Sequence, residues 1–427
     1  MSNISETNVD PHSQVNAGLR APKLSSWNAI FIFILTALFL CYEMGVQVSP
    51  SVMTQYLMHD LGISALQLGF MSGFYYYTYT LMQIPAGLLF DRFKIHYVIV
   101  IPLVVVAIGA LLFSFSQGIL LGSVGRLCMG TGSAFAFIAV LVVASDLFPE
   151  KYFALLVGLT QMLAAFGAML GEAPLVPLIH HLSWRGAMQL LAVVAIILAV
   201  SIWLFVRYEK CNQVKGCDAE SVSILKSLKI ILSNKQSWFV AFYACCLWAP
   251  MAAFASLWGV PFLETVYGLS KIHASEMITL MWLGIAIASP LLGWFSDAIG
   301  SRRIPLAFSA LIGIVAFFIL DKGFDLSPVM IGLLVFLGGA ACSGQALSFA
   351  VVRDNNPSHT MAAAIGFNNM AVVIAGAVFQ PLVAYVIGDQ SIAHFEAGIS
   401  IITGCFFVGL LLALFFLKAK PTSLASK

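Results

Sequence analysis

The sequence predicts an all-α integral membrane protein with twelve membrane-spanning helices in two bundles of six. Three observations predict this fold class. First, 60% of the 427 residues are hydrophobic and only 9% are charged, whereas an ordinary soluble protein is about 25% charged. Second, apolar runs of about 20 residues recur, each long enough to cross a hydrocarbon core of ~30 Å. Third, the two halves of the chain repeat one another at a fixed offset, which indicates an internal duplication.

The apolar runs fall into two groups of six. Lipid offers backbone groups no hydrogen-bond partner, so runs of this length are expected to be helices. The first group is expected near 27–49, 65–90, 95–115, 118–145, 153–178 and 184–208. The second is expected near 238–263, 275–297, 304–320, 327–352, 361–387 and 395–417. The predicted domains are therefore a tail (1–26), an N-terminal bundle (27–208), a central loop (209–237), a C-terminal bundle (238–418) and a tail (419–427).

The distribution of lysine and arginine sets the orientation. The first 26 residues are polar and carry no cleavage signal, so the first apolar run is expected to be retained as a helix. With both termini in the cytoplasm, seventeen lysines and arginines fall on the inner side. Only three fall on the outer side: Arg185, Lys271 and Lys322. This bias predicts the orientation of a multi-pass membrane protein. The membrane we expect is a bacterial inner membrane.

The central loop and the cysteines add two further expectations. In the loop, Val222, Leu225, Leu228 and Leu232 share one helical face, which predicts a short amphipathic helix on the inner leaflet or, alternatively, a solvated linker. Six of the eight cysteines fall in predicted helices, and Cys211 and Cys217 fall in the cytoplasmic loop. Because that compartment is reducing, we expect no disulfides.

The internal repeat is visible in polar positions as well as in helix number. Asp146 and Asp354, Pro149 and Pro357, and Gly158 and Gly366 are each separated by 208 residues. The stretches "GLLFDRFK" and "GWFSDAIGSRR" follow the second and the eighth predicted helix. Several independent matches at corresponding places indicate a duplicated six-helix unit.

These stretches resemble the signature G-x-x-x-D-R/K-x-G-R-R/K of the major facilitator superfamily of transporters. The first copy keeps Gly87, Asp91 and Arg92, with Lys94 in place of the second glycine. The second copy keeps Gly293, Asp297, Gly300, Arg302 and Arg303. The resemblance covers essentially the whole chain and implies that the two loops are cytoplasmic gate elements, in which Asp91 and Asp297 latch the outward-facing state. The alternative for the basic residues is simple anchoring at the inner surface.

Three charged residues fall inside the predicted helices, all in the N-terminal half. Arg126 lies ~12 Å below the outer end of the fourth predicted helix, and Glu43 on the first and Glu172 on the fifth lie at a similar level. An unpaired guanidinium in hydrocarbon costs roughly 3 kcal/mol on insertion scales. We therefore expect Arg126 to pair with Glu43 or Glu172 and to face a central cavity. The trio is expected to anchor an anionic group or to carry a proton, and the alternative is a permanent structural ion pair.

Neutral polar residues complete the candidate site. On the second predicted helix Tyr76, Tyr79 (or Thr80) and Gln83 share one face, whereas Tyr75 and Tyr77 are alternatives for an interfacial belt. Gln161 on the fifth helix corresponds to Asn369 across the repeat. The C-terminal half contributes only neutral candidates: Trp248, Trp282, Gln345, Asn368, Asn369 and Gln380.

The second predicted helix is similar to that of organic-anion and sugar-acid symporters. It is also loosely similar to that of nutrient permeases of intracellular bacteria and of lysosomal short-peptide carriers. The fourth helix keeps Gly125, Arg126 and Gly130 of the symporter pattern but has Ser133 and Ala134 where those symporters have an acid and an alanine. A glutamate appears instead on the fifth helix, as Glu172. The symporters' substrate is therefore not carried over.

Together these features predict a secondary transporter that imports a small polar carboxylate, such as an amino acid, short peptide or organic acid, with protons. The sequence has no GxxxxGK[ST] loop, so ATP is not the expected energy source. We expect a monomer in the bilayer with no cofactor, metal or nucleic-acid partner, and no enzyme activity. The alternatives are an exporter of amphipathic drugs or siderophores, which the 33 phenylalanines favour, and a transporter-like membrane sensor.

Overall fold

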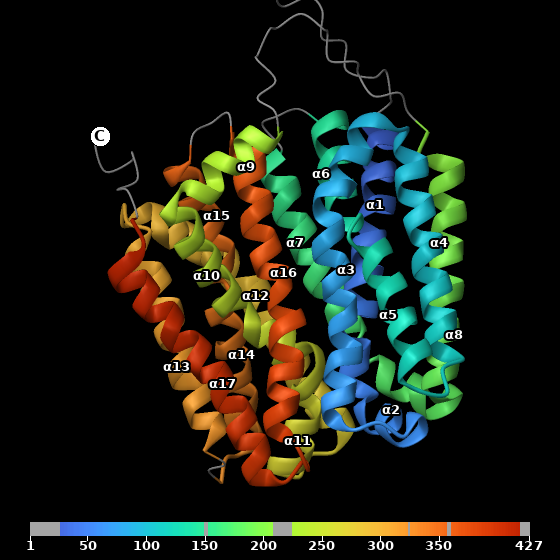
Figure 1. The fold of residues 1–427 in the computed structure, drawn as a ribbon, viewed down its shortest axis with the longest axis vertical. Helices are drawn as coiled ribbons and strands as arrows, with labels where there is room; N and C mark the ends of the chain where they lie inside the picture. Colours follow the sequence, from blue (N-terminus) through green and yellow to red (C-terminus); the bar gives the residue numbers. More distant parts are fainter. Residues whose placement is uncertain (1–25, 149–152, 208–223, 323–324, 357–359, 419–427) are drawn as a thin grey trace, which may run out of the picture.

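The computed structural model describes residues 26–148, 153–207, 224–322, 325–356 and 360–418, and every regular element within these ranges is a helix (Figure 1). The predicted tails and most of the central loop lie outside them. We call the end of the molecule that carries α9 the inner end and the end that carries α2 and α11 the outer end, as the lysine and arginine bias predicts (Figure 1).

The N-terminal half begins with α1 and ends with α8. Its elements are α1 (Ser26–Val48), the 3₁₀ helix η2 (Ser49–Val52), α2 (Thr54–Leu61), α3 (Ala65–Arg92), α4 (Ile95–Ser114), α5 (Ile119–Ser133), α6 (Ala136–Leu147), α7 (Phe153–Leu170) and α8 (Leu175–Phe205).

The C-terminal half contains two stretches of π-helix. Its elements are α9 (Ile224–Ser233), α10 (Lys235–Ala249), the π-helix η4 (Pro250–Trp258), α11 (Gly259–Tyr267), α12 (Lys271–Ala298), α13 (Arg303–Asp321), α14 (Pro328–Cys342), α15 (Gly344–Asn355), α16 (Met361–Ile387), α17 (Ile392–Leu411) and the π-helix η6 (Leu412–Phe416). The predicted amphipathic helix of the central loop corresponds to α9, although the side chains of Val222, Leu225 and Leu228 lie outside the described part.

Ten segments of the described chain are long and apolar enough to cross a membrane. The helices α3 and α7 are not among them, although both run alongside the spanning helices (Figure 1). The predicted runs agree closely with these helices, and the all-helical membrane fold is confirmed. The count of twelve spans stays a prediction.

The prediction is wrong where the fifth run meets the sixth. The runs at 153–178 and 184–208 were expected to flank a loop, but α7 ends at Leu170 and α8 begins at Leu175. Gly171 ends α7 tightly against α1, since an added Cβ there would lie 2.5 Å from the Gly45 carbonyl oxygen. The expected start of the sixth run instead coincides with a kink inside α8 at Ser183, whose φ is +62°. Glu172 therefore lies in the turn between α7 and α8, not within a helix.

The two halves are joined along α3 and α16, which lie side by side (Figure 1). An added Cβ on Gly69 of α3 would lie 2.7 Å from the Ala384 side chain of α16, so the helices touch closely near their outer ends. Further inward, the Tyr77 hydroxyl donates to the Ala377 carbonyl oxygen at 3.0 Å. Small residues let the backbones of membrane helices approach in this way. The outer half of the interface is therefore sealed.

Candidate functional site

Arg126 on α5 is almost completely buried, with 1% of its surface exposed. Its guanidinium donates to the carbonyl oxygens of Val46 and Gln47 on α1, both at 3.4 Å, and of Ser72 on α3 at 3.5 Å. These distances exceed the usual 2.7–3.2 Å, so the bonds are weak. The Nε atom has no hydrogen-bond partner in the described part of the chain. The guanidinium therefore keeps donor capacity for an anionic ligand.

The expected ion pair between Arg126 and a glutamate is wrong. No carboxylate of the described residues lies within 4.0 Å of its guanidinium. The connection to Glu43 runs instead through Tyr75 on α3, whose ring lies 4.6 Å from Cζ of Arg126. The Tyr75 hydroxyl donates to Oε1 of Glu43 on α1. A ring face attracts a cation and a hydroxyl hydrogen attracts a carboxylate, so one tyrosine stabilises both charges at once.

Glu43 itself is fully buried, and its Oε2 has no hydrogen-bond partner among the described residues. A buried carboxylate without a cation is costly, and protonation removes that cost. The residue is therefore placed to hold a proton one side chain away from the guanidinium. Tyr79 stacks on Tyr75, with ring centroids 6.0 Å apart, and extends the aromatic wall toward the inner end.

Tyr76 on α3 extends the candidate site to the C-terminal half. Its ring lies against α16, where an added Cβ on Gly376 would be 2.6 Å from the ring carbons. Its hydroxyl has no hydrogen-bond partner in the described structure, although Gln47 of α1 and Ser256 of η4 lie beside it. Tyr76 is thus a predicted site residue that contacts both halves.

The C-terminal side of this interface is formed by the π-helix η4. Gln380 of α16 donates from Nε2 to the Ala252 carbonyl oxygen at 2.8 Å, and Trp258 donates from Nε1 to the Gln380 carbonyl oxygen at 3.0 Å. The Oε1 atom of Gln380 has no partner in the described part of the chain. π-helical turns occur frequently at functional sites.

Glu172 lies apart from Arg126, on the turn that follows α7. Its Oε2 accepts a hydrogen bond from the Ser51 hydroxyl of η2 at 2.7 Å. The carboxyl is fully buried, and within the described ranges its Oε1 has no partner. The three predicted charges therefore form two separate sites, one at Arg126 with Glu43 and one at Glu172.

The other predicted site residues are distributed along the helices. Asn369 of α16 donates to Oε1 of Gln83 on α3 at 3.2 Å, which joins the two halves toward the inner end. Trp248 is half-buried with its ring against Trp282. Asn368 is buried on α16 and donates to the Ser348 hydroxyl at 2.9 Å. Gln345 is buried at the start of α15, and Gln161 is exposed on α7.

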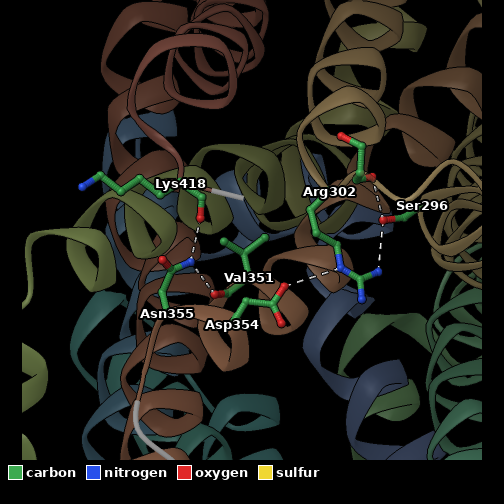
Figure 2. Close-up of polar contacts among 7 residues, drawn as sticks. Ser296, Arg302, Val351, Asp354, Asn355 and Lys418 are labelled. Carbon is green, nitrogen blue, oxygen red and sulfur yellow. Dashed lines mark hydrogen bonds and ion pairs between the residues drawn. The ribbon is translucent and has the colours of Figure 1, made fainter. Parts of the chain in front are cut away.

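The second signature loop is anchored inside the C-terminal half. Figure 2 shows Arg302, which precedes α13, directed at Asp354 near the end of α15. The two groups are 3.7 Å apart, and Arg302 also donates to the Ser296 hydroxyl at 3.1 Å. Asp354 is the repeat partner of Asp146 in the sequence. The repeated acidic position thus meets the signature arginine.

The remaining signature residues are less informative. The side chains of Asp91, Arg92 and Asp297 lie outside the described structure, so the predicted latch stays a prediction. An added Cβ on Gly87 or Gly293 would meet nothing within 4 Å, so packing does not require glycine there. Arg303 is exposed, as an anchor at the inner surface would be.

Two exposed acidic residues at the outer rim, Asp60 and Asp389, have lowered pKa values. Hydrogen bonds from His59 and from the Trp184 indole, the latter at 2.8 Å, lower the pKa of Asp60 on α2. At the turn before α17, hydrogen bonds from His394 and from the backbone of Ser391 lower the pKa of Asp389 to about 2. These rim carboxylates are exposed, in contrast to buried Glu43 and Glu172.

Two bundles of membrane helices, with buried charges in the N-terminal bundle, are typical of membrane transport proteins. The chain belongs to the Major Facilitator Superfamily, whose sequence profile matches residues 35–275 and 251–427. It is a multi-pass membrane protein of a transporter family, and its named relatives are transporters and not enzymes.

Several curated relatives are bacterial transporters. The chain is 25% identical to the uncharacterized transporter YybO of Bacillus subtilis over 61% of this chain and 63% of that protein, so the match spans less than two thirds of that relative. It is 28% identical to the hexuronate transporter of Escherichia coli over 76% of this chain and 79% of the relative. It is 24% identical to the probable galactarate/D-glucarate transporter GudP of Bacillus subtilis over 83% and 85% of the two chains.

A solved structure supports the fold. A bacterial homologue of the human lysosomal transporter Spinster, in an inward-facing and unoccupied conformation, superposes with a TM-score of 0.73 over 91% of this chain and 96% of that chain. The sequences are only 14% identical, so this likeness concerns the fold alone.

Sequence reasoning missed three contributors to these sites. Tyr75 was an alternative for the interfacial belt, yet it is buried and joins Glu43 to Arg126. Ser51 and Ser256 were not singled out at all. The run of three consecutive tyrosines was the available signal for Tyr75, because adjacent residues on a helix point in different directions and only some of them can face lipid.

Proposed function

We propose that this protein imports a small carboxylate-bearing solute together with protons, by alternating access in a bacterial inner membrane. The observation that carries the proposal is the environment of Arg126. Among the described residues, the buried guanidinium has long bonds to backbone carbonyls and the face of the Tyr75 ring but no carboxylate partner. A substrate carboxylate would supply the missing anion.

Proton coupling is assigned to Glu43. A carboxylate bound at Arg126 would bring negative charge next to the Tyr75–Glu43 pair, where two uncompensated negative charges are costly. Protonation of Glu43 removes one of them. Substrate and proton then bind together more favourably than either binds alone, which is the thermodynamic requirement for symport.

Sugar acids are the first solutes to test. The relatives are named as transporters of hexuronate and of galactarate or D-glucarate, all of which are carboxylates. The aromatic wall of Tyr75, Tyr76 and Tyr79 suits the apolar face of a sugar ring, and amides such as Gln83 and Asn369 suit its hydroxyls.

The test is uptake of labelled glucuronate, galactonate and galactarate into proteoliposomes, with and without an alkaline interior. We expect accumulation of at least one solute that depends on the pH gradient and collapses with a protonophore.

The carboxylate site is tested by substitution. Arg126→Lys should reduce uptake by about 100-fold, because an ammonium cannot offer the planar two-point contact. Arg207→Lys, at the exposed end of α8, is the matched control and should retain uptake. Accumulation that ignores the gradient would remove the symport claim, and normal uptake by Arg126→Lys would remove the carboxylate site.

A further inference from the structure

Glu172 is a buried carboxyl that the proposed transport site does not use. It lies in the turn between α7 and α8, fully buried, and among the described residues its one side-chain hydrogen bond comes from Ser51. The turn is held against α1 by close glycine contacts, since an added Cβ on Gly167 would lie 2.0 Å from the Cys41 carbonyl oxygen. The position of the turn that carries Glu172 is therefore fixed by backbone packing.

Within the described ranges this carboxyl has no cationic partner. Among the described residues no lysine, arginine or histidine nitrogen lies within 4.0 Å of it. The neighbouring elements carry many ionisable groups. They are Cys41, Tyr42 and Glu43 on α1, Tyr56, His59 and Asp60 on α2, His180, His181 and Arg185 on α8, Glu264 and Tyr267 on α11, and Lys271, His273, Glu276 and Asp297 on α12. Burial disfavours the charged form of Glu172, and the hydrogen bond from Ser51 favours it. A buried, unpaired carboxylate costs several kcal/mol, so the sealed structure favours the protonated form.

The hydrogen-bond donor to Glu172 belongs to the outer seal. Ser51 lies in η2, whose four residues are all buried. This short helix contacts η4 and α11 of the C-terminal half. Outward opening must separate these elements, because they belong to opposite halves. Water then reaches the turn that carries Glu172, and hydration stabilises the ionised carboxylate.

We propose that Glu172 is a proton-binding site of the outer gate, separate from the coupling site at Glu43, and that its protonation from the outer side stabilises the sealed state. The proton binds from the outer solution as the seal forms and returns to that solution when the seal opens. It therefore makes outer closure depend on external pH without adding to the protons carried per solute.

The proposal can be tested without substrate, by measuring how the width of the outer interface depends on pH. Spin labels at Gln55 of α2 and Ala393 of α17, both exposed at the outer end, report the width of the outer interface in nanodiscs, with the eight native cysteines replaced. Between pH 5.5 and pH 8.5 we expect the sealed fraction of the otherwise unmodified protein to fall about threefold or more, because deprotonation favours the open state. Glu172→Gln keeps the acceptor for Ser51 but cannot ionise, so its sealed fraction should stay constant. Glu276→Gln, an exposed carboxyl on α12, is the matched control and should respond to pH like the parent.

Two results would overturn the inference: an unmodified protein whose outer interface ignores pH, or a Glu172→Gln protein that opens with pH as the parent does. If Glu172→Gln does not fold, Ser51→Ala gives a second test. Removing the donor to the ionised form should raise the midpoint pH of opening, and an unchanged midpoint would contradict the proposal. Because these measurements involve no solute and no gradient, they remain informative if the proposed symport fails.

Discussion

At the scale of single residues, the central feature is a tyrosine between two buried charges. Tyr75 places its ring against Arg126 and its hydroxyl on Glu43, so a guanidinium and a carboxylate are linked without touching. A direct salt bridge would satisfy both groups and leave little affinity for a ligand. The intervening ring keeps the charges near each other but incompletely compensated, which is the condition that binding an anion and a proton requires.

Two substitutions separate the contributions of ring and hydroxyl. Tyr75→Phe keeps the aromatic face for Arg126 and removes the bond to Glu43, so substrate KM should change little while gradient-driven accumulation falls about tenfold, as loss of one charge-assisted hydrogen bond implies. Tyr75→Leu also removes the ring and should raise KM. The measurement is initial uptake and steady-state accumulation in proteoliposomes. Equal behaviour of the two variants would show that the ring does not stabilise Arg126.

The charged residues of the site could be predicted from sequence, but their partners could not. Arg126, Glu43 and Glu172 stand out because ionisable residues are rare in apolar runs. The expected pairing failed because matched depth along helices does not fix rotation about the helix axis. That rotation turns Arg126 toward the carbonyls of α1 and α3. Glu172 lies beyond the end of α7, in the turn before α8, where it accepts a hydrogen bond from Ser51.

At the scale of helices, small residues decide which elements touch closely. Gly167 and Gly171 of α7 pack against Cys41 and Gly45 of α1. Backbones in direct contact leave no space for side chains, so this pair of helices is rigid. The contact fixes the turn with Glu172 relative to the helix that carries Glu43. The glycine spacing was visible in the sequence, whereas the π-helical η4 was not, because no composition signal marks a single extra residue per turn.

The rigidity of α1 and α7 can be tested by adding one methyl group. Gly167→Ala would place Cβ 2.0 Å from the Cys41 carbonyl oxygen, and backbone atoms cannot move aside cheaply. We expect the free energy of unfolding to fall by roughly 1–3 kcal/mol and the melting temperature in detergent to fall with it. Gly404→Ala on α17, where an added Cβ meets nothing within 4 Å, is the control. A melting temperature equal to that of the control would mean that the two helices are free to separate.

At the scale of the whole molecule, the seal between the halves combines apolar packing with weak polar contacts. At the rim, the Lys271 amine lies 4.3 Å from the centre of the Tyr56 ring, and Gln390 donates to the Met58 sulfur at 3.6 Å. Deeper, Tyr76 fills the space over Gly376. None of these contacts is strong alone, which suits an interface that must open in every transport cycle. The helices on either side were predictable from hydropathy, but the closed state was not, because the same sequence must form both states.

Gly376 gives a direct way to shift this equilibrium. Gly376→Ala would place Cβ 2.6 Å from the ring of Tyr76, which is buried and has no free space to move into. The clash exists only while the halves are closed. It should therefore raise the free energy of the closed state relative to the outer-open state by about 1–3 kcal/mol. Each 1.4 kcal/mol increases the ratio of open to closed molecules roughly tenfold. Spin labels at Gln55 and Ala393 should then report a longer distance at pH 5.5. Gly366→Ala lies on the same helix, where an added Cβ meets nothing within 4 Å, and should keep the parental distance. An unchanged distance in Gly376→Ala would mean that Tyr76 repacks freely and that the seal depends on contacts elsewhere along α3 and α16.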